Sequence, residues 1–170
     1  MTAPEIAGRR STAVVVLAVL SALLVVACVV LAVFWQFDRA DRQHAAAARE
    51  AARGAAVTAI LNLDALSTAT IDRDLARVVA GATGDFKDQF TKAQADLKSL
   101  VVSRKTTSSG QILSAAVVRS DLDTATVLVA VDRLVKDSTT PNGTTAHDRW
   151  KLDLERHGGR WLVANLEAVA

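Results

Sequence analysis

Apolar residues are distributed unevenly along the chain, and one long apolar run stands near the N-terminus. Residues 13–34 read AVVVLAVLSALLVVACVVLAVF and contain no charged residue. About 20 apolar residues in a helix span the roughly 30 Å hydrocarbon core of a bilayer. Trp35 and Phe37 follow, where aromatic side chains meet the membrane interface. The pattern predicts a cytoplasmic tail over residues 1–12 and a transmembrane helix over residues 13–37.

Two other interpretations of the apolar run compete with an anchor. A cleaved signal peptide has an apolar region of about 7–15 residues and a small-residue cleavage site, whereas this run is longer and ends in FWQF. A lipoprotein signal would be cut before Cys28, but apolar residues continue after that cysteine. We therefore expect an uncleaved anchor, represented by Ala13, Val16, Leu20, Leu24, Cys28, Leu31, Phe34 and Trp35.

The residues after the anchor predict a stalk and then three amphipathic helices. Residues 38–54 are rich in alanine and arginine, which are good helix formers, and predict a solvated helical stalk. A domain over residues 55–170 follows. We expect Gly81 and Gly84 to end the second helix, and Asp85 to cap the third. The three apolar stripes are Ala56, Ile60 and Leu63, then Ile71, Leu75 and Val78, then Phe86, Phe90, Ala93, Leu97, Leu100 and Val101.

After residue 103 the apolar period changes from that of a helix to that of a strand. The segment RKTTSSG at 104–110 predicts a loop, and HGGR at 157–160 predicts a tight hairpin turn. The second strand is apolar on both faces in its middle, so we expect both faces to be covered. The predicted strands are residues 111–119, 124–136, 148–156 and 160–169, with a longer loop over 137–146.

This order of elements predicts an α+β domain in which three helices pack on a curved four-stranded antiparallel sheet. Such a cone is the shape of nuclear-transport-factor-2-like and cystatin-like proteins. Its aromatic and apolar residues would fill the contact between helices and sheet, line a ligand cavity, or form a docking patch. These candidate residues are Phe86, Phe90, Leu97, Val129, Trp150, Leu152, Trp161 and Val163.

Composition mainly excludes classes of function. The net charge of +2 gives no strongly basic surface for nucleic acid, and the single cysteine rules out an internal disulfide or a cysteine-rich zinc site. No phosphate-binding loop, dinucleotide-binding motif or nucleophile elbow is present. His44, His147 and His157 do not pair at helical spacing with another ligand. We therefore expect no metal and no cofactor.

An enzyme of the ketosteroid isomerase kind would need an acid or base inside the cone and a donor for an oxyanion. Tyrosine is absent, and Asp132 is the best candidate for an inward carboxylate. Arg133 and Lys136 nearby favour a surface ion pair instead. We expect the protein not to be an enzyme.

Several segments resemble the Mce (mammalian cell entry)-associated membrane proteins of actinobacteria. They are AGATGDF at 80–86 with Phe90, SGQIL at 109–113, ATVLVAV at 125–131, Arg149-Trp150, and GRWLV at 159–163 with Leu166-Glu167. The resemblance implies a non-enzymatic accessory subunit of an Mce-type transporter of lipid (fatty acid or sterol) in the cell envelope. Its implied partners are membrane lipid, transporter subunits, and identical or paralogous associated subunits. It supplies no catalytic residues.

Charge alone does not decide the orientation of the anchor, because arginines stand on both sides of it. With the resemblance, we expect the N-terminus inside and the domain on the extracytoplasmic side of the cytoplasmic membrane. A layout of one anchor and one cone domain also resembles an inner-membrane scaffold subunit of type IV secretion systems. The alternative function is a membrane-anchored lipid carrier, whose interior would be an open apolar pocket of a few hundred Å³.

Overall fold

The computed structural model describes residues 28, 31, 35 and 42–169, in two compact units divided between residues 43 and 44. In the first unit, Cys28, Leu31 and Trp35 are helical and exposed. The other residues of the expected anchor, and the cytoplasmic tail, lie outside the described residues. Among the helices that are described, none combines the length and apolar character needed to cross a bilayer.

The second unit begins with a helix whose alanines pack closely, and this differs from the solvated stalk expected up to residue 54. Residues 44–64 are helical in this unit, and Ala48, Ala52 and Ala56 are buried. Arg49 donates from Nη2 to the carbonyl oxygen of Val117 at 3.1 Å. Alanine side chains are small, so the helix approaches the sheet closely. The compact unit therefore starts at residue 44, not at residue 55.

Two further helices follow, α2 (Ile71–Ala80) and α3 (Gly84–Arg104). Gly81 caps the C-terminus of α2, as expected. The prediction for the start of α3 was wrong, because Thr83 is the N-cap residue and Asp85 lies in the first turn. Gly84 begins α3 with a positive φ of 53° and does not end the preceding helix. The reason is tertiary, since the backbone N–H of Thr83 donates to the carbonyl of Val163 at 2.8 Å.

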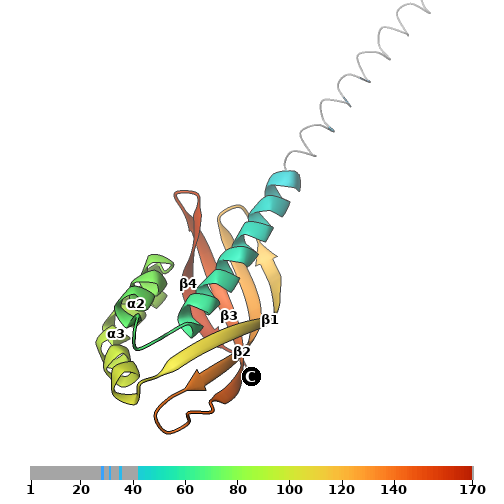
Figure 1. The fold of residues 1–170 in the computed structure, drawn as a ribbon. Coiled ribbons are helices and arrows are strands. Elements are labelled where there is room, and N and C mark those ends of the chain that lie inside the picture. The colour runs from blue at the N-terminus through green and yellow to red at the C-terminus, as the bar shows by residue number, and fades with distance from the viewer. Residues whose placement is uncertain (1–27, 29–30, 32–34, 36–41, 170) are drawn as a thin grey trace, which may run out of the picture. The chain divides into compact units, whose positions relative to one another are not determined.

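The sheet contains β1 (Thr107–Ser120), β2 (Thr124–Lys136), β3 (Thr144–His157) and β4 (Arg160–Ala168). The strands are antiparallel in the order β1-β2-β3-β4, and the three helices lie against this sheet (Figure 1). This confirms the predicted α+β arrangement of three helices on a four-stranded antiparallel sheet. The turn between β3 and β4 is formed by Gly158 and Gly159, both at positive φ, which suits a two-residue hairpin.

Two strands begin earlier than the alternation of residues predicts, β1 at Thr107 and β3 at Thr144. The polar start of β1 was predicted to be a loop, but it is held from outside the sheet. Ser108 donates its hydroxyl to the carbonyl of Asp64 at 2.6 Å, and its backbone N–H donates to the carbonyl of Leu66 at 2.8 Å. Only glycine fits at Gly110, because a Cβ there would lie 2.7 Å from Asp64 Oδ2.

Apolar side chains form two clusters on the helical side of the sheet. The first lies between the helix at 44–64 and the sheet, and the second joins α2 to α3. Phe86 packs against both clusters and lies 5.9 Å from the ring of Phe90. The first cluster consists of Ala56, Ile60, Val127, Val129, Val131, Leu152, Leu154 and Val163, and the second of Leu66, Ile71, Leu75, Val78, Phe90 and Val101.

The other face of the sheet is open within the described part of the chain, contrary to the expectation that both faces of β2 are covered. Leu128 of β2 is exposed, although Val127 and Val129 beside it are buried. β1 is also irregular, with shifts in its pairing to β2 around Leu113 and Val118. Both of these apolar residues are exposed. Leu100 of α3, expected on the buried stripe, is exposed as well.

Candidate functional site

The interior of the domain is the first place to look for a ligand site, because the candidate lining residues meet there. Val129, Leu152 and Val163 are buried in the cluster against the sheet, with Trp150 and Trp161 half-buried beside it. Phe90 and Leu97 belong instead to the cluster between α2 and α3.

The free space in this interior is small. The cavity bordered by Ile60, Phe86, Leu152 and Val163 has a volume of about 20 Å³. A single water molecule needs roughly 10–15 Å³ by this measure, and pockets for small molecules enclose about 300–1,000 Å³. Side chains therefore fill the space that a lipid carrier would need for its ligand.

Asp132, the candidate for an inward carboxylate, lies on the opposite face of the sheet from the core. Its neighbour Val131 is buried in that core, and successive strand residues point to opposite faces. Asp132 Oδ1 lies 2.6 Å from Nδ1 of His147, whose side chain is largely exposed. Among the described residues, no group of His, Cys, Asp and Glu is placed to hold a metal ion. Asp132 therefore forms a surface pair, which the sequence favoured over an inward carboxylate, but its partner is His147 and not Arg133 or Lys136.

A buried carboxylate does lie at the end of the helix at 44–64. Asp64 is 3% exposed, and its Oδ1 lies 3.6 Å from Nε of Arg133. The guanidinium of Arg133 binds Asp148 more closely, at 2.9 Å. The second oxygen of Asp64 has no hydrogen-bond partner among the described residues. Burial raises the pKa of Asp64 to about 6, although the charge of Arg133 partly opposes this shift.

This carboxylate should make the stability of the domain depend on pH. The folded protein retains the Asp64 proton up to about pH 6, whereas the unfolded chain releases it near 3.8, so stability falls as the pH rises through that window. The difference corresponds to about 3 kcal/mol. We expect Asp64→Asn to flatten the dependence and to raise the free energy of unfolding at pH 7.5 by about 1–3 kcal/mol.

Urea denaturation between pH 4 and pH 8 measures both effects. Asp88→Asn, at an exposed position of α3, is the matched control and should keep the slope of the wild type. The raised pKa of Asp64 would be contradicted if the free energy of unfolding of the wild type increased from pH 4 to pH 7 and Asp64→Asn left this profile unchanged.

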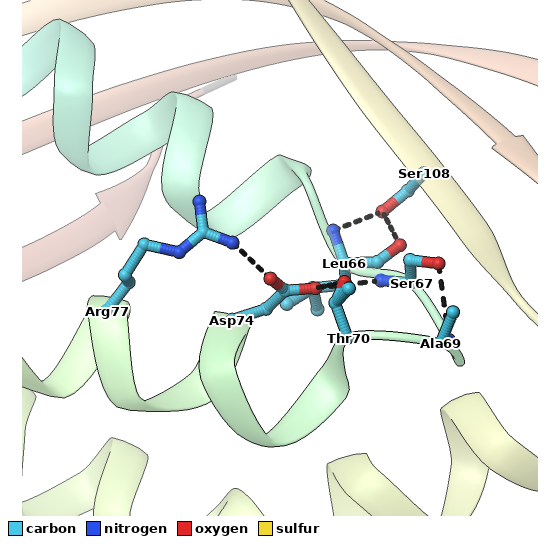
Figure 2. Close-up of polar contacts among 7 residues, drawn as sticks. All are labelled: Leu66, Ser67, Ala69, Thr70, Asp74, Arg77 and Ser108. Atoms are coloured by element: carbon cyan, nitrogen blue, oxygen red, sulfur yellow. Dashed lines mark hydrogen bonds and ion pairs between the residues drawn. The ribbon is translucent and has the colours of Figure 1, made fainter.

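A second buried carboxylate fixes the connection between the helix at 44–64 and α2 (Figure 2). Asp74 is 1% exposed and accepts hydrogen bonds from Thr70 Oγ1 at 2.6 Å and from the backbone N–H of Ser67 at 3.2 Å. Arg77 forms an ion pair with its other oxygen. Ser108 of β1 contacts Leu66 in the same connection. These contacts fix the first turn of α2 to the connection that follows the helix at 44–64.

Two neighbouring hollows, of about 380 and 350 Å³, lie on the surface along the helix at 44–64, and both have Trp161 in their linings. The helix contributes residues 44, 47, 48 and 51 to one hollow and residues 55, 58, 59 and 62 to the other. Steps of three and four residues keep these positions on one helix face, so the two hollows are parts of one surface. We call it the Trp161 groove; its other lining residues are Arg77, Ala80, Gly81, Leu122, Arg156, Gly159, Arg160 and Leu162.

Two arginines of the Trp161 groove have no carboxylate partner among the described residues. Arg156 donates to the carbonyl of Leu122, and Arg160 to the carbonyl of Ala80, each at 3.4 Å. A larger hollow, of about 780 Å³, crosses the open face of the sheet, and the lysine in its lining does have carboxylate partners. There, Lys151 is paired with Glu167 at 2.9 Å and lies 3.9 Å from Asp153. The groove thus keeps uncompensated positive charge beside an apolar floor.

The sequence indicated only part of this groove. Trp161 was a candidate for the core or for a docking patch, whereas His44 and the alanines after it were assigned to a solvated stalk. The spacing of Ala48, Ala51, Ala55 and Ala59 on one helix face was the available signal.

Comparison with known proteins places the chain in a family. Residues 10–170 match the family described as uncharacterized protein Rv1363c/MT1408-like. The chain belongs to this family. It is 30% identical over 138 residues to protein Rv1363c of Mycobacterium tuberculosis strain H37Rv, which covers 81% of this chain and 52% of that protein. The chain thus spans about half the length of this relative.

A second relative in the same organism is similar over more of its length. The protein named outer membrane protein Rv1973 is 30% identical over 141 residues, which cover 79% of this chain and 83% of that protein.

Solved structures show where else this fold occurs. The periplasmic domain of DotI aligns with a TM-score of 0.58 at 12% identity, over 69% of this chain and 91% of that domain. A periplasmic fragment of TraM aligns with a TM-score of 0.56 at 10% identity, over 70% of this chain and 95% of that fragment. An IcmL-like type IV secretion system protein of Legionella pneumophila also aligns, with a TM-score of 0.58 at 12% identity, over 69% of this chain and 88% of that protein. At such identities the likeness establishes a shared fold and nothing more.

Proposed function

We propose that the protein is a non-enzymatic accessory subunit of a membrane complex in the cell envelope, and specifically of an Mce-type lipid transporter. The observation that carries the proposal is a filled interior together with an open Trp161 groove. Such a domain contacts its partners through its surface. The shared fold with periplasmic domains and the segments that resemble Mce-associated proteins support this assignment.

The proposed location is the extracytoplasmic side of the cytoplasmic membrane, with residues 13–37 as the anchor. The apolar run supports an anchor, and the fold shared with periplasmic domains supports an extracytoplasmic position. The name of Rv1973 suggests the outer membrane as the alternative. Separation of the two membranes by density, followed by immunodetection, distinguishes these locations.

The two alternative functions have less support. A lipid carrier would need far more than the cavity of about 20 Å³ beside Leu152. An isomerase-like enzyme would need an acid or base at a cavity inside the cone. Asp132 lies on the other face of the sheet, paired with His147, and the buried Asp64 does not line the cavity of about 20 Å³.

Purification of the tagged full-length protein from native membranes in mild detergent tests the proposed function. We expect the subunits of such a transporter, namely Mce proteins, a permease and an ATPase, to be enriched with it, relative to an unrelated single-pass protein carrying the same tag. Recovery of the protein without these subunits would overturn the assignment to an Mce-type transporter.

A further inference from the structure

The Trp161 groove has the length of a helix of several turns. Its lining on the helix at 44–64 runs from His44 to Asn62, about 27 Å at 1.5 Å per residue. Alanines at 48, 51, 55 and 59 form much of this floor. Small side chains allow a second helix to lie at an interaxial distance of about 8–10 Å.

The two hollows offer places for large apolar side chains on either side of Trp161. Ala51 borders one hollow and Ala59 the other, a separation of about 12 Å along the helix. Two anchors of an amphipathic helix that stand seven residues apart are separated by about 10.5 Å on one face. The indole of Trp161 is half-buried between the two positions, and aromatic side chains are common anchors of interfaces.

The charge of the groove specifies the chemistry of the occupant. Arg156 lines one hollow and Arg160 lines the other. Each makes a single long contact to a backbone carbonyl. A guanidinium binds a carboxylate through two parallel hydrogen bonds, which are stronger than bonds between neutral groups. An occupant with Asp or Glu beside its apolar stripe would satisfy both arginines.

The openness of the groove favours a helix over a lipid chain. Sites for small molecules bury about 70–90% of the ligand surface, whereas each hollow here is open to solvent along one side. An amphipathic helix needs to bury only its apolar stripe and leaves its polar face in water.

We propose that the Trp161 groove binds an acidic amphipathic helix from a partner protein of the same envelope complex. This inference rests on the proposed function, because it names the surface through which the subunit joins its complex. The partner helix lies along the alanines of residues 48–59, with apolar side chains on both sides of Trp161 and carboxylates near Arg156 and Arg160.

Site-specific photo-crosslinking in intact cells tests this proposal with the full-length protein. A photo-reactive residue replaces Ala51 or Ala55 in the groove, or Ala95 as the matched control at an exposed position of α3. We expect strong crosslinks at Ala51 and Ala55, weak ones at Ala95, and a crosslinked peptide with acidic residues and helical apolar spacing. The double variant Arg156→Glu with Arg160→Glu should lower the yield at Ala51 about tenfold, from the loss of two exposed charge pairs.

Arg119→Glu is the charge control, because Arg119 lines the hollow on the open face of the sheet. It should leave the yield at Ala51 unchanged, and the circular dichroism of all variants should match the wild type. Crosslinks to lipid, to a non-acidic or non-helical segment, or no stronger than at Ala95 would overturn the proposal. So would a yield that the double variant leaves unchanged.

The outcomes separate this inference from the proposed function. If transporter subunits co-purify with the protein but the groove gives no crosslink above the control, only the docking site is wrong. If an acidic helix is crosslinked but belongs to a protein outside a transporter, the groove stands and the assignment to an Mce-type complex fails.

Discussion

Replacing Asp74 by alanine is expected to lower the free energy of unfolding by about 2–5 kcal/mol, because a buried carboxylate that accepts two hydrogen bonds and pairs with the half-exposed Arg77 is lost. The carboxylate is almost fully buried and holds Thr70, Ser67 and Arg77. Alanine would leave the hydroxyl and the amide without their acceptor inside the protein, at roughly 1–3 kcal/mol each. Urea denaturation followed by tryptophan fluorescence measures the loss.

Asp72→Ala is the matched control, because it changes the same residue type in the same turn of α2. Asp72 is 76% exposed and pairs with Lys98 at the surface. Exposed pairs contribute about 0–1 kcal/mol, so this variant should unfold close to the wild type. Equal losses for the two variants would show that Asp74 does not organise the connection before α2.

Leu152→Ala should lower the free energy of unfolding by about 2–5 kcal/mol, the range for a leucine removed from a packed core. Leu152 is 0% exposed and belongs to the cluster between the sheet and the helix at 44–64. It also borders the cavity of about 20 Å³, so removing its side chain would enlarge a void that already exists. The same denaturation experiment gives the value.

Leu113→Ala serves as its control, because Leu113 is 58% exposed on β1. A surface substitution of this kind usually changes stability by about 0.5 kcal/mol or less. A loss below about 1 kcal/mol for Leu152→Ala would mean that the interior is loosely filled. In that case the lipid-carrier alternative would regain support.

Local pattern was sufficient for much of the fold. Val127, Val129 and Val131 alternate with less buried neighbours in β2, and the Gly158-Gly159 pair marks a two-residue turn. Both signals depend on residues close in sequence, so the order of strands and their antiparallel pairing were predicted correctly.

The errors share a physical cause, which is contact with residues far away in the chain. Alanine suits a solvated helix and a tightly packed one equally well. Residues 44–54 are therefore recognised as packed only from contacts with the distant sheet, such as the bond to the carbonyl of Val117. Ser108 and Gly110 read as loop residues, but they belong to β1 because Asp64 packs against them. Thr83 replaces Asp85 as the cap of α3 because Val163 holds its backbone.

In the candidate site, too, the local signals could be recognised from the sequence, and the features that depend on the folded surface could not. Trp161 was recognised as a residue that either fills the core or forms a docking patch, because an aromatic after a tight turn is visible in sequence. The arginines beside it carried no such signal. Arg156 and Arg160 lack a carboxylate partner among the described residues and line the same groove, and that placement depends on the folded surface.

The irregular pairing of β1 has a consequence for behaviour at high concentration. β1 is an edge strand of fourteen residues, long enough to template cross-β growth on a neighbouring molecule. The extra residues at Leu113 and Val118 break its regular spacing of amide and carbonyl groups. A continuous ribbon of strands between molecules, built on the β1 edge, is therefore disfavoured.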